Sequence, residues 1–341
     1  MITTQSLKER WAAFKEENSK TRIRDAAKQL GVSEAELLAT QIGETVQRLD
    51  GDFRDLLRKV PTLGYVMALT RNDHIVHERK GVYEQVSFTE QTGLVLGPDI
   101  DLRLFMSRWH FGFAVDENDR KSLQFFDKDG LAVHKIYLTD KSDEAAYETL
   151  VQTYLAADQT APIVTVSYPE KVTETTDKDV DIQAFQEGWL AMQDTHEFFG
   201  LLRKHKLDRE QGLRMAPKGY AEQISVDQLK KIFETVAERE IPIMIFASSP
   251  GCIQIHTGLV KKLVSMGPWY NVLDPNFNMH LREDQINSIW VTRKPTKDGI
   301  VTGLDLFDKG GNSIALMFGK RKPGIPEMKE WQDIVREVIA T

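Results

Sequence analysis

The residues of this 341-residue chain that are best able to do chemistry lie around one histidine. His196 lies in the stretch L-A-M-Q-D-T-H-E-F-F-G, which begins at Leu190. Spacings of three and four positions predict a single helix with one stripe here. The stripe consists of Trp189, Met192, His196, Phe199 and Arg203. A neutral imidazole can ligate a metal, but a lone histidine on such a stripe is more often a core or boundary residue, and the local spacing leaves both interpretations open.

A second reactive side chain, Arg103, lies in the strand-like stretch D-L-R-L-F. Alternation places Leu102 and Leu104 on one face of the strand, and Asp101, Arg103 and Phe105 on the other. One interpretation is a solvated outer face with an Asp–Arg pair. The other is a pocket wall, in which Phe105 offers a flat apolar surface and Arg103 a permanent positive charge.

An imidazole, aromatic rings and several arginines and lysines are what a site for an iron porphyrin requires. Imidazole ligates iron, the rings pack on the macrocycle, and the cations pair with its propionates. The same parts also suit other flat anions, so the residue types alone do not choose the ligand.

Other familiar sites are missing from the sequence. It contains no P-loop, G-x-G-x-x-G, H-E-x-x-H or G-x-S-x-G motif, which weakens nucleotide-binding, zinc-protease and serine-hydrolase interpretations. His74 and His77 have a spacing that suits a metal on a helix, but their segment has the pattern of a strand end or turn, where they point to opposite faces. The single Cys252 excludes an internal disulfide, and we expect it to be a buried apolar residue.

Composition and charge are those of an ordinary globular protein, with 41% hydrophobic residues, 28% charged residues and a net charge of −7. The negative charge argues against general nucleic-acid binding. The N-terminal stretch has no apolar core of signal-peptide length, and the longest apolar runs are too short to span a bilayer. We therefore expect a cytoplasmic protein without membrane insertion.

The chain repeats its own sequence pattern. The matching segments are 81–86 with 258–263, 98–104 with 275–281, and 123–130 with 304–311. The first two pairs are 177 residues apart and the third is 181 apart, which fits a four-residue insertion near Lys294 to Lys297. Each copy has about the size of one domain, so we predict a tandem duplication. Its parts are an N-terminal repeat (1–160), a linker (161–181) and a C-terminal repeat (182–341).

Each copy begins with helical patterning and ends in strands. Ser33 with Glu36, and Asp208 with Gln211, have the spacing of capping boxes that open helices. F-D-K-D-G and F-D-K-G-G predict hairpin turns whose glycines adopt positive φ. The predicted strands include G-Y-V-M-A-L, K-S-L-Q-F-F, A-V-H-K-I-Y-L, I-P-I-M-I-F, I-N-S-I-W-V-T and S-I-A-L-M-F. Helices grouped before strands predict an α+β fold with a large antiparallel sheet in each half.

The two copies differ at the residues of interest. In the repeat alignment His196 lies opposite Asn18, and Arg103 lies opposite His280. Asparagine cannot act as an imidazole ligand, so the divergence is what a protein with one site rather than two would show. Neutral drift produces the same divergence.

Several separated motifs resemble those of the bacterial haemin-degrading factors, the HemS/ChuS-like haem-utilisation proteins. The motifs are D-L-R-L-F, the helical stretch W-L-A-M-Q-D-T-H-E-F-F-G-L-L-R-K-H, the strand G-C-I-Q-I-H-T-G, and W-V-T-R-K-P-T-K-D-G. The resemblance extends from about Trp11 to beyond Arg321 and includes the internal duplication. It implies two similar α+β halves with large antiparallel sheets, and one haem in a cleft between helical and sheet elements.

The resemblance also implies roles for single residues. His196 matches the iron ligand, and Arg103 matches a catalytic residue on the opposite side of the haem that acts on iron through water. The positions associated with the haem propionates are Arg209, Lys294 and Arg321. The positions that line the pocket are Phe105, Phe246 and Phe318. Relatives have tyrosine where this chain has Phe318, which keeps the apolar wall and removes a phenolic hydrogen bond.

The function implied by the resemblance is haem binding followed by porphyrin ring opening and iron release, for iron acquisition. In an oxidative reaction, an external electron donor of unknown identity reduces the iron, and Arg103 stabilises negative charge on bound oxygen. Reductive ring opening and simple iron removal stay open. The partners implied are a reductase and an inner-membrane haem importer, and the chain is expected to be a monomer or a homodimer.

Two alternatives belong to other functional classes. The first is a non-enzymatic haem carrier that receives haem from the importer and passes it to a separate oxygenase. Carrier and enzyme would share His196, so only turnover distinguishes them. The second is a haem-independent binding or regulatory protein, for which His196→Ala would leave ligand binding unaltered.

Overall fold

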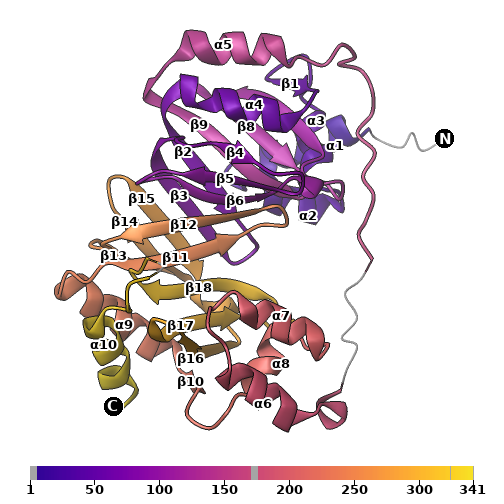
Figure 1. Ribbon diagram of the computed structural model, residues 1–341. Coiled ribbons are helices and arrows are strands. Elements are labelled where there is room, and N and C mark those ends of the chain that lie inside the picture. Colours follow the sequence, from indigo (N-terminus) through magenta and orange to yellow (C-terminus); the bar gives the residue numbers. More distant parts are fainter. Residues whose placement is uncertain (1–5, 170–175, 323, 341) are drawn as a thin grey trace. The chain divides into compact units, whose positions relative to one another are not determined.

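The computed structural model describes residues 6–169, 176–322 and 324–340 (Figure 1). The chain divides into two compact units. Unit 1 comprises Met1–Arg71, Glu78–Pro169 and Ser248–Gln254, and unit 2 comprises Asn72–His77, Glu170–Ala247 and Ile255–Thr341.

Unit 1 is an α+β structure. Its helices are α1 (Leu7–Glu17), α2 (Ile23–Leu30), α3 (Glu34–Ala39), α4 (Phe53–Lys59) and α5 (Glu144–Thr153), with short 3₁₀ turns at η1 (Val60–Leu63) and η2 (Met106–Arg108). Its strands are β1 (Val46–Leu49), β2 (Gly64–Arg71), β4 (Ser87–Phe88), β5 (Thr92–Leu96), β6 (Asp101–Phe105), β7 (Phe111–Glu117), β8 (Arg120–Phe126) and β9 (Ala132–Ser142). The capping box predicted at Ser33 and Glu36 is present at the start of α3.

Unit 2 has the same class of structure. Its helices are α6 (Ile182–Leu190), α7 (Glu197–Lys204), α8 (Arg209–Arg214), α9 (Val226–Glu238) and α10 (Lys329–Ile339), with 3₁₀ turns at η3 (Asp177–Asp179) and η4 (Glu283–Gln285). Its strands are β10 (Ala221–Ile224), β11 (Ile243–Ser248, the last residue of which belongs to unit 1), β13 (Leu263–Met266), β14 (Trp269–Leu273), β15 (Phe277–Arg282), β16 (Ser288–Thr296), β17 (Gly299–Phe307) and β18 (Ser313–Gly319). Two further strands, β3 (Ile75–Val82) and β12 (Cys252–Gly258), are divided between the units.

The strands form two nine-stranded sheets. Their orders are β1-β7-β8-β9-β2-β3-β15-β14-β13 and β10-β16-β17-β18-β11-β12-β6-β5-β4. Neighbouring strands pair antiparallel in both sheets, for example β8 with β9 and β17 with β18. These pairings confirm the predicted α+β class with large antiparallel sheets.

The predicted strands and their turns are also confirmed. F-D-K-D-G connects β8 to β9 and F-D-K-G-G connects β17 to β18. Gly130 has φ of +79° and Gly311 has φ of +71°, a region that glycine adopts without the steric penalty of a Cβ atom.

Helices cover both faces of the β10-β16-β17-β18-β11 part of unit 2. On one face, α9 and α10 lie side by side in Figure 1 and bury Phe233 and Trp331 in one cluster with Val291, Leu304 and Met317 of the strands. The helices α6, α7 and α8 share a second cluster with the strand residues Trp290 and Phe307. Because side chains alternate along a strand, Trp290 points to the face opposite Val291, so α6 to α8 cover that second face.

The prediction of one continuous helix through His196 is wrong. Helix α6 ends at Leu190 and α7 begins at Glu197, so the chain leaves the helix for six residues. Within this connection, Oδ1 of Asp194 accepts a hydrogen bond of 2.8 Å from the backbone N–H of His196. Aspartate favours such local bonds over a helix interior, which is consistent with a break in the helix here.

The predicted four-residue insertion is visible as a longer hairpin. Strands β7 and β8 have 7 residues each, whereas their counterparts β16 and β17 have 9 each. The insertion therefore lengthens each arm of the second hairpin by two residues, and Lys294 lies in the lengthened arm.

The proposed boundaries of the repeats at residues 160 and 181 stay predictions. Part of the proposed linker, 170–175, lies outside the described residues. Among the described residues, no helix is long and apolar enough to cross a membrane.

Candidate functional site

His196 stands at the exposed start of α7 as its N-cap residue. Its side chain is 93% exposed, and its Nδ1 lies 2.6 Å from Oδ1 of Asp194. A carboxylate can only accept, so the imidazole donates from Nδ1. Nε2 makes no hydrogen bond to any residue that the structure describes, and it is therefore available to an external ligand.

The connection that carries His196 is tied to its surroundings at several points. The backbone N–H of Lys297, at the tip of the β16–β17 hairpin, donates to the carbonyl of Gln193 at 2.9 Å. The N–H of Gln193 donates to Oε2 of Glu197 at 3.1 Å. Before the connection, the indole N–H of Trp189 donates to the carbonyl of Arg293 at 3.1 Å. The lengthened hairpin thus supports the segment that presents His196.

Arg321 acts electrostatically on the same segment. The hydrogen bond from the His196 backbone and, to a smaller extent, the charge of Arg321 hold the pKa of Asp194 below its ordinary value. The half-buried Arg321 forms no ion pair with a described residue, so its charge is available to an anion near His196.

Two of the predicted cations meet at one buried carboxylate. Arg209 Nε donates to Asp305 Oδ1 at 2.5 Å, and Lys294 Nζ lies 3.7 Å from Asp305 Oδ2. Lys294 Nζ also donates to Oγ1 of Thr292 at 2.9 Å. Two cations face one carboxylate, which leaves an excess of one positive charge. In this structure the two cationic groups point at Asp305, and their role at haem propionates stays a prediction.

Burial and charge oppose each other in this group. Burial lowers the pKa of Lys294 to about 8, against the effect of Asp305. Burial alone would raise the pKa of Asp305, but Arg209 and Lys294 hold it below its ordinary value. The Lys294 ammonium also lies 4.8 Å from the centre of the Phe198 ring, so an aromatic face helps to solvate it.

Alternation brings Lys294, Phe318 and Phe246 to one face of the sheet. Thr292, Gly303 and Phe318 are neighbours across β16, β17 and β18, and Lys294 is two residues along from Thr292. Residues two apart share a face, so Lys294 and Phe318 lie on the face that α6 to α8 cover. On β11, Phe246 lies against Phe318 with ring centres 5.4 Å apart and planes at 80°. Both rings are half-buried, which leaves apolar surface for a ligand.

Arg103 and Phe105 belong to unit 1 and lie on β6. The predicted alternation is confirmed, because Leu102 and Leu104 are fully buried while Phe105 is exposed. Arg103 forms an ion pair with Asp101 on the same face. The Asp–Arg pair of the simpler interpretation is therefore present, and the catalytic role of Arg103 stays a prediction.

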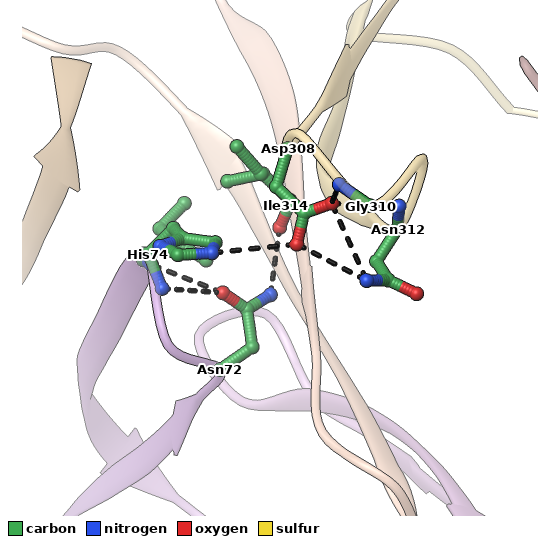
Figure 2. Close-up of polar contacts among 7 residues, drawn as sticks. Asn72, His74, Asp308, Gly310, Asn312 and Ile314 are labelled. Carbon is green, nitrogen blue, oxygen red and sulfur yellow. Dashed lines mark hydrogen bonds and ion pairs between the residues drawn. The ribbon is translucent and has the colours of Figure 1, made fainter. Parts of the chain in front are cut away.

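The residues His74 and His77 have separate surroundings. Figure 2 shows the His74 ring directed at Asp308, and Nε2 lies 3.4 Å from Oδ2 of that carboxylate. Asp308 Oδ1 also accepts hydrogen bonds from the backbone N–H groups of Gly310 and Asn312, so it belongs to the F-D-K-G-G turn. His77 is fully buried in β3 and lies against Phe277, with ring centres 4.9 Å apart.

Cys252 is buried in β12, as predicted. Burial raises the pKa of its thiol to about 12, so it carries no thiolate at neutral pH. Thr70 Oγ1 donates to its sulfur at 3.4 Å. Cys252 is therefore a packing residue of unit 1.

Comparison with known proteins shows the family to which the chain belongs. Residues 31–154, and again 206–338, match the family model described as the haemin-degrading HemS.ChuX domain. The chain is 38% identical over 339 residues to the hemin transport protein HemS of Yersinia enterocolitica, with 97% of this chain and 96% of that one covered. The chain belongs to the HemS/ChuS-like family. The resemblance drawn from the motifs is confirmed, and the double match confirms the tandem duplication.

Two solved structures are similar to this HemS/ChuS-like chain over nearly its whole length. Holo-PhuS, a heme-binding protein from Pseudomonas aeruginosa, has 44% identity and a TM-score of 0.94, covering 96% of this chain and 97% of that one. ChuS, described as an E. coli heme oxygenase, has 35% identity and a TM-score of 0.88, covering 98% of this chain and 100% of that one. The relatives thus include both a haem-binding protein and a haem oxygenase.

Asp194 and Asp305 of this HemS/ChuS-like chain are site residues that the sequence interpretation missed. A usable signal for Asp305 is its place in the apolar strand G-L-D-L-F, since a buried carboxylate needs a cation. A second signal is Arg209 at the first position of α8, where the helix dipole disfavours a cation. A positive charge that the helix dipole disfavours indicates that a contact with another element, and not the helix itself, requires arginine at this position.

The first repeat also has a buried ion pair at the first residue of a capped helix, but its strand partner lies on β9, whereas Asp305 lies on β17, the counterpart of β8. There the first residue of α3, Glu34, pairs with Lys135 of β9 at 2.5 Å, and both are buried. The helix therefore supplies the acid in unit 1 and the base, Arg209, in unit 2. Glu34 also lies 3.9 Å from a guanidinium nitrogen of Arg24, so two cations face one carboxylate in the first repeat as well.

Proposed function

We propose that this chain binds one haem as its substrate or cargo and degrades it, with His196 as the iron ligand. The observation that supports this most strongly is the exposed imidazole whose Nδ1 is bound to a carboxylate while Nε2 is free among the described residues. Neutral imidazole is the usual nitrogen ligand of haem iron, and it needs no deprotonation at neutral pH.

The other residues of unit 2 fit the rest of a haem molecule. The half-buried pair Phe246 and Phe318 offers apolar contact for a macrocycle. Arg321 and the excess positive charge at Arg209 and Lys294 suit carboxylate groups. Phe318 cannot donate a hydrogen bond, so we propose that it contributes packing alone.

In the proposed reaction the haem supplies the redox-active iron and the porphyrin that is opened. Oxidative opening also needs dioxygen or peroxide and an external reductant. His196 holds the haem by its iron, and the cations orient the propionate edge. By resemblance alone we propose that Arg103 and Phe105 would also contact the haem, where Arg103 would stabilise negative charge that develops during the reaction.

A carrier function is the second candidate, because the similar HemS protein is named a hemin transport protein. In that case the same residues bind haem, and a separate oxygenase would degrade it. An importer would supply haem in either case.

Turnover separates the two candidates. The haemin complex of the full chain is given a reductant, with and without oxygen, while the Soret absorption and released iron are followed. Loss of the Soret band with iron release supports degradation, whereas a Soret band that persists under all conditions overturns it in favour of the carrier. If the Soret band is lost equally in the His196→Ala variant, the reaction does not take place at the site built on His196. His110→Ala, which removes an exposed imidazole of unit 1, is the matched control.

A further inference from the structure

We propose that Asp194 is the positioning residue of His196: it holds the imidazole proton on Nδ1 and thereby directs the bare Nε2 toward the iron of haem. This inference rests on the proposed function for the iron, but the tautomer and orientation of the ring are properties of the protein alone.

Asp194 contacts His196 twice, once at its backbone and once at its ring. Its Oδ1 accepts the backbone N–H of His196 at 2.8 Å and lies 2.6 Å from Nδ1 of the same residue. The first bond holds the carboxylate against the backbone of His196, and the second holds the imidazole against the carboxylate. Rotation of the ring would break the second bond, so the ring has one favoured direction.

The proton must lie on Nδ1, because an ionised carboxylate has no proton to donate. In a neutral imidazole with a proton on Nδ1, Nε2 carries the lone pair. The side chain is 93% exposed, so that lone pair faces solvent or a ligand and not the protein interior. A solvent-exposed imidazole without this contact favours the proton on Nε2, which is the wrong tautomer for ligation through that atom.

The segment that carries Asp194 is itself held in place. On its N-terminal side Gln193 accepts from the backbone of Lys297, and its own N–H donates to Glu197 in the first turn of α7. Lys297 is at the tip of the hairpin that is longer in the second repeat. In the repeat alignment Asn18 lies opposite His196, and the first repeat has the shorter hairpin, so His196 and the longer hairpin occur in the same copy.

Asp194 also affects how strongly His196 donates to a metal. A carboxylate that accepts the Nδ1 proton increases the electron density on the imidazole and strengthens the bond from Nε2. Loss of such an outer partner commonly lowers metal affinity by about 10- to 100-fold. Asp194→Asn keeps an acceptor oxygen without the charge, whereas Asp194→Ala removes both bonds.

The first test needs no haem. Two-bond ¹H–¹⁵N correlation spectra of the full chain, labelled at histidine, report the tautomer of His196. We expect the Nδ1–H tautomer in wild type and a shift toward Nε2–H in Asp194→Ala. Asp181→Asn is the control, because it removes the same charge from the N-cap of α6, where Asn caps equally well. An Asp194→Ala variant that keeps the wild-type tautomer overturns the proposal.

The second test uses haemin and the iron–imidazole stretching band in resonance Raman spectra of the ferrous complex. Asp194→Ala should raise the haemin Kd about 10- to 100-fold, and Asp194→Asn should shift the band to lower wavenumber. Asp181→Asn should match wild type, and an equal loss there would overturn the proposal by showing a general charge effect. If His196→Ala binds haemin as wild type does, the proposed function fails, while the tautomer result still decides the role of Asp194.

Discussion

At the level of single residues, the candidate site combines the exposed imidazole of His196 with a buried cluster of charged side chains. Asp305 is fully buried and is the common partner of Arg209 and Lys294. Buried ions are stable only when each has a partner, so removal of the shared carboxylate affects both cations.

Asp305→Asn should therefore lower the free energy of unfolding by about 3–5 kcal/mol, because it leaves the ammonium of Lys294 buried without a counter-charge. The double variant Asp305→Asn/Lys294→Met should recover at least half of that loss, since it removes the stranded charge. Guanidinium unfolding of the full chain measures both. Asp333→Asn, which breaks the exposed pair with Arg336, is the control and should change stability by less than about 1 kcal/mol. If Asp305→Asn and wild type had equal free energies of unfolding, Asp305 would not be the counter-charge that stabilises buried Lys294.

A second buried carboxyl, Glu327, should make stability depend on pH. Burial raises its pKa to about 7, and the N–H of Thr302 donates to its Oε2 at 2.8 Å. The folded state holds the proton at pH values where the unfolded state has lost it. Stability from this group is therefore fully present below about pH 4.5 and is lost as the pH rises toward 7.

Glu327→Gln should remove that pH dependence, because glutamine stays neutral and can turn its oxygen toward the Thr302 N–H. A shift of this size corresponds to at most about 3 kcal/mol. The difference in unfolding free energy between Glu327→Gln and wild type should grow in favour of the variant from pH 5 to pH 8. A constant difference across that range would show that Glu327 ionises normally.

At the level of elements, the three helices that position the site differ in how tightly they pack. A Cβ atom added at Gly200 on α7 would meet nothing within 4 Å. One added at Gly212 on α8 would lie 2.4 Å from Leu202 and 3.3 Å from Phe185. The exposed face of α7 is open, whereas α8 is in close contact with its neighbours.

Gly200→Ala should stabilise the chain by about 0.5–1 kcal/mol, the difference in helix propensity between the two residues. Gly212→Ala should destabilise it by about 1–3 kcal/mol, because the added methyl group displaces packed side chains. Both substitutions add the same methyl group to a helix, so each controls for the other in urea or guanidinium unfolding. If both substitutions changed the free energy of unfolding in the same direction, the close contact of α8 with Leu202 and Phe185 would be contradicted.

Strands and turns could be predicted from the sequence because alternation and glycine position are local properties. The helix through His196 could not, because five stripe residues matched a helical period while Asp194 provided a competing local bond. The contact of Lys294 with Asp305 joins residues on different strands, and Arg209 reaches it from a distant helix. Such contacts depend on the tertiary structure, so no local sequence pattern predicts them directly.

At the level of the whole molecule, the chain contains two similar repeats, and the residues of the proposed haem site in unit 2 differ from those of the first repeat. His196, the longer β16–β17 hairpin and the cationic helix start at Arg209 all belong to the second repeat. The first repeat has a shorter hairpin and an acidic helix start at Glu34, and the repeat alignment places Asn18 opposite His196. The first residues of α3 and α8 therefore carry opposite charges in the two repeats.

The most direct test of this account is a haemin titration of the full chain, followed by the Soret absorption. We predict saturation at one haemin per chain in wild type and loss of saturable binding in His196→Ala. The His110→Ala control should bind as wild type does. Two equivalent sites per chain, or unchanged saturable binding in His196→Ala, would contradict a single haem site built on His196.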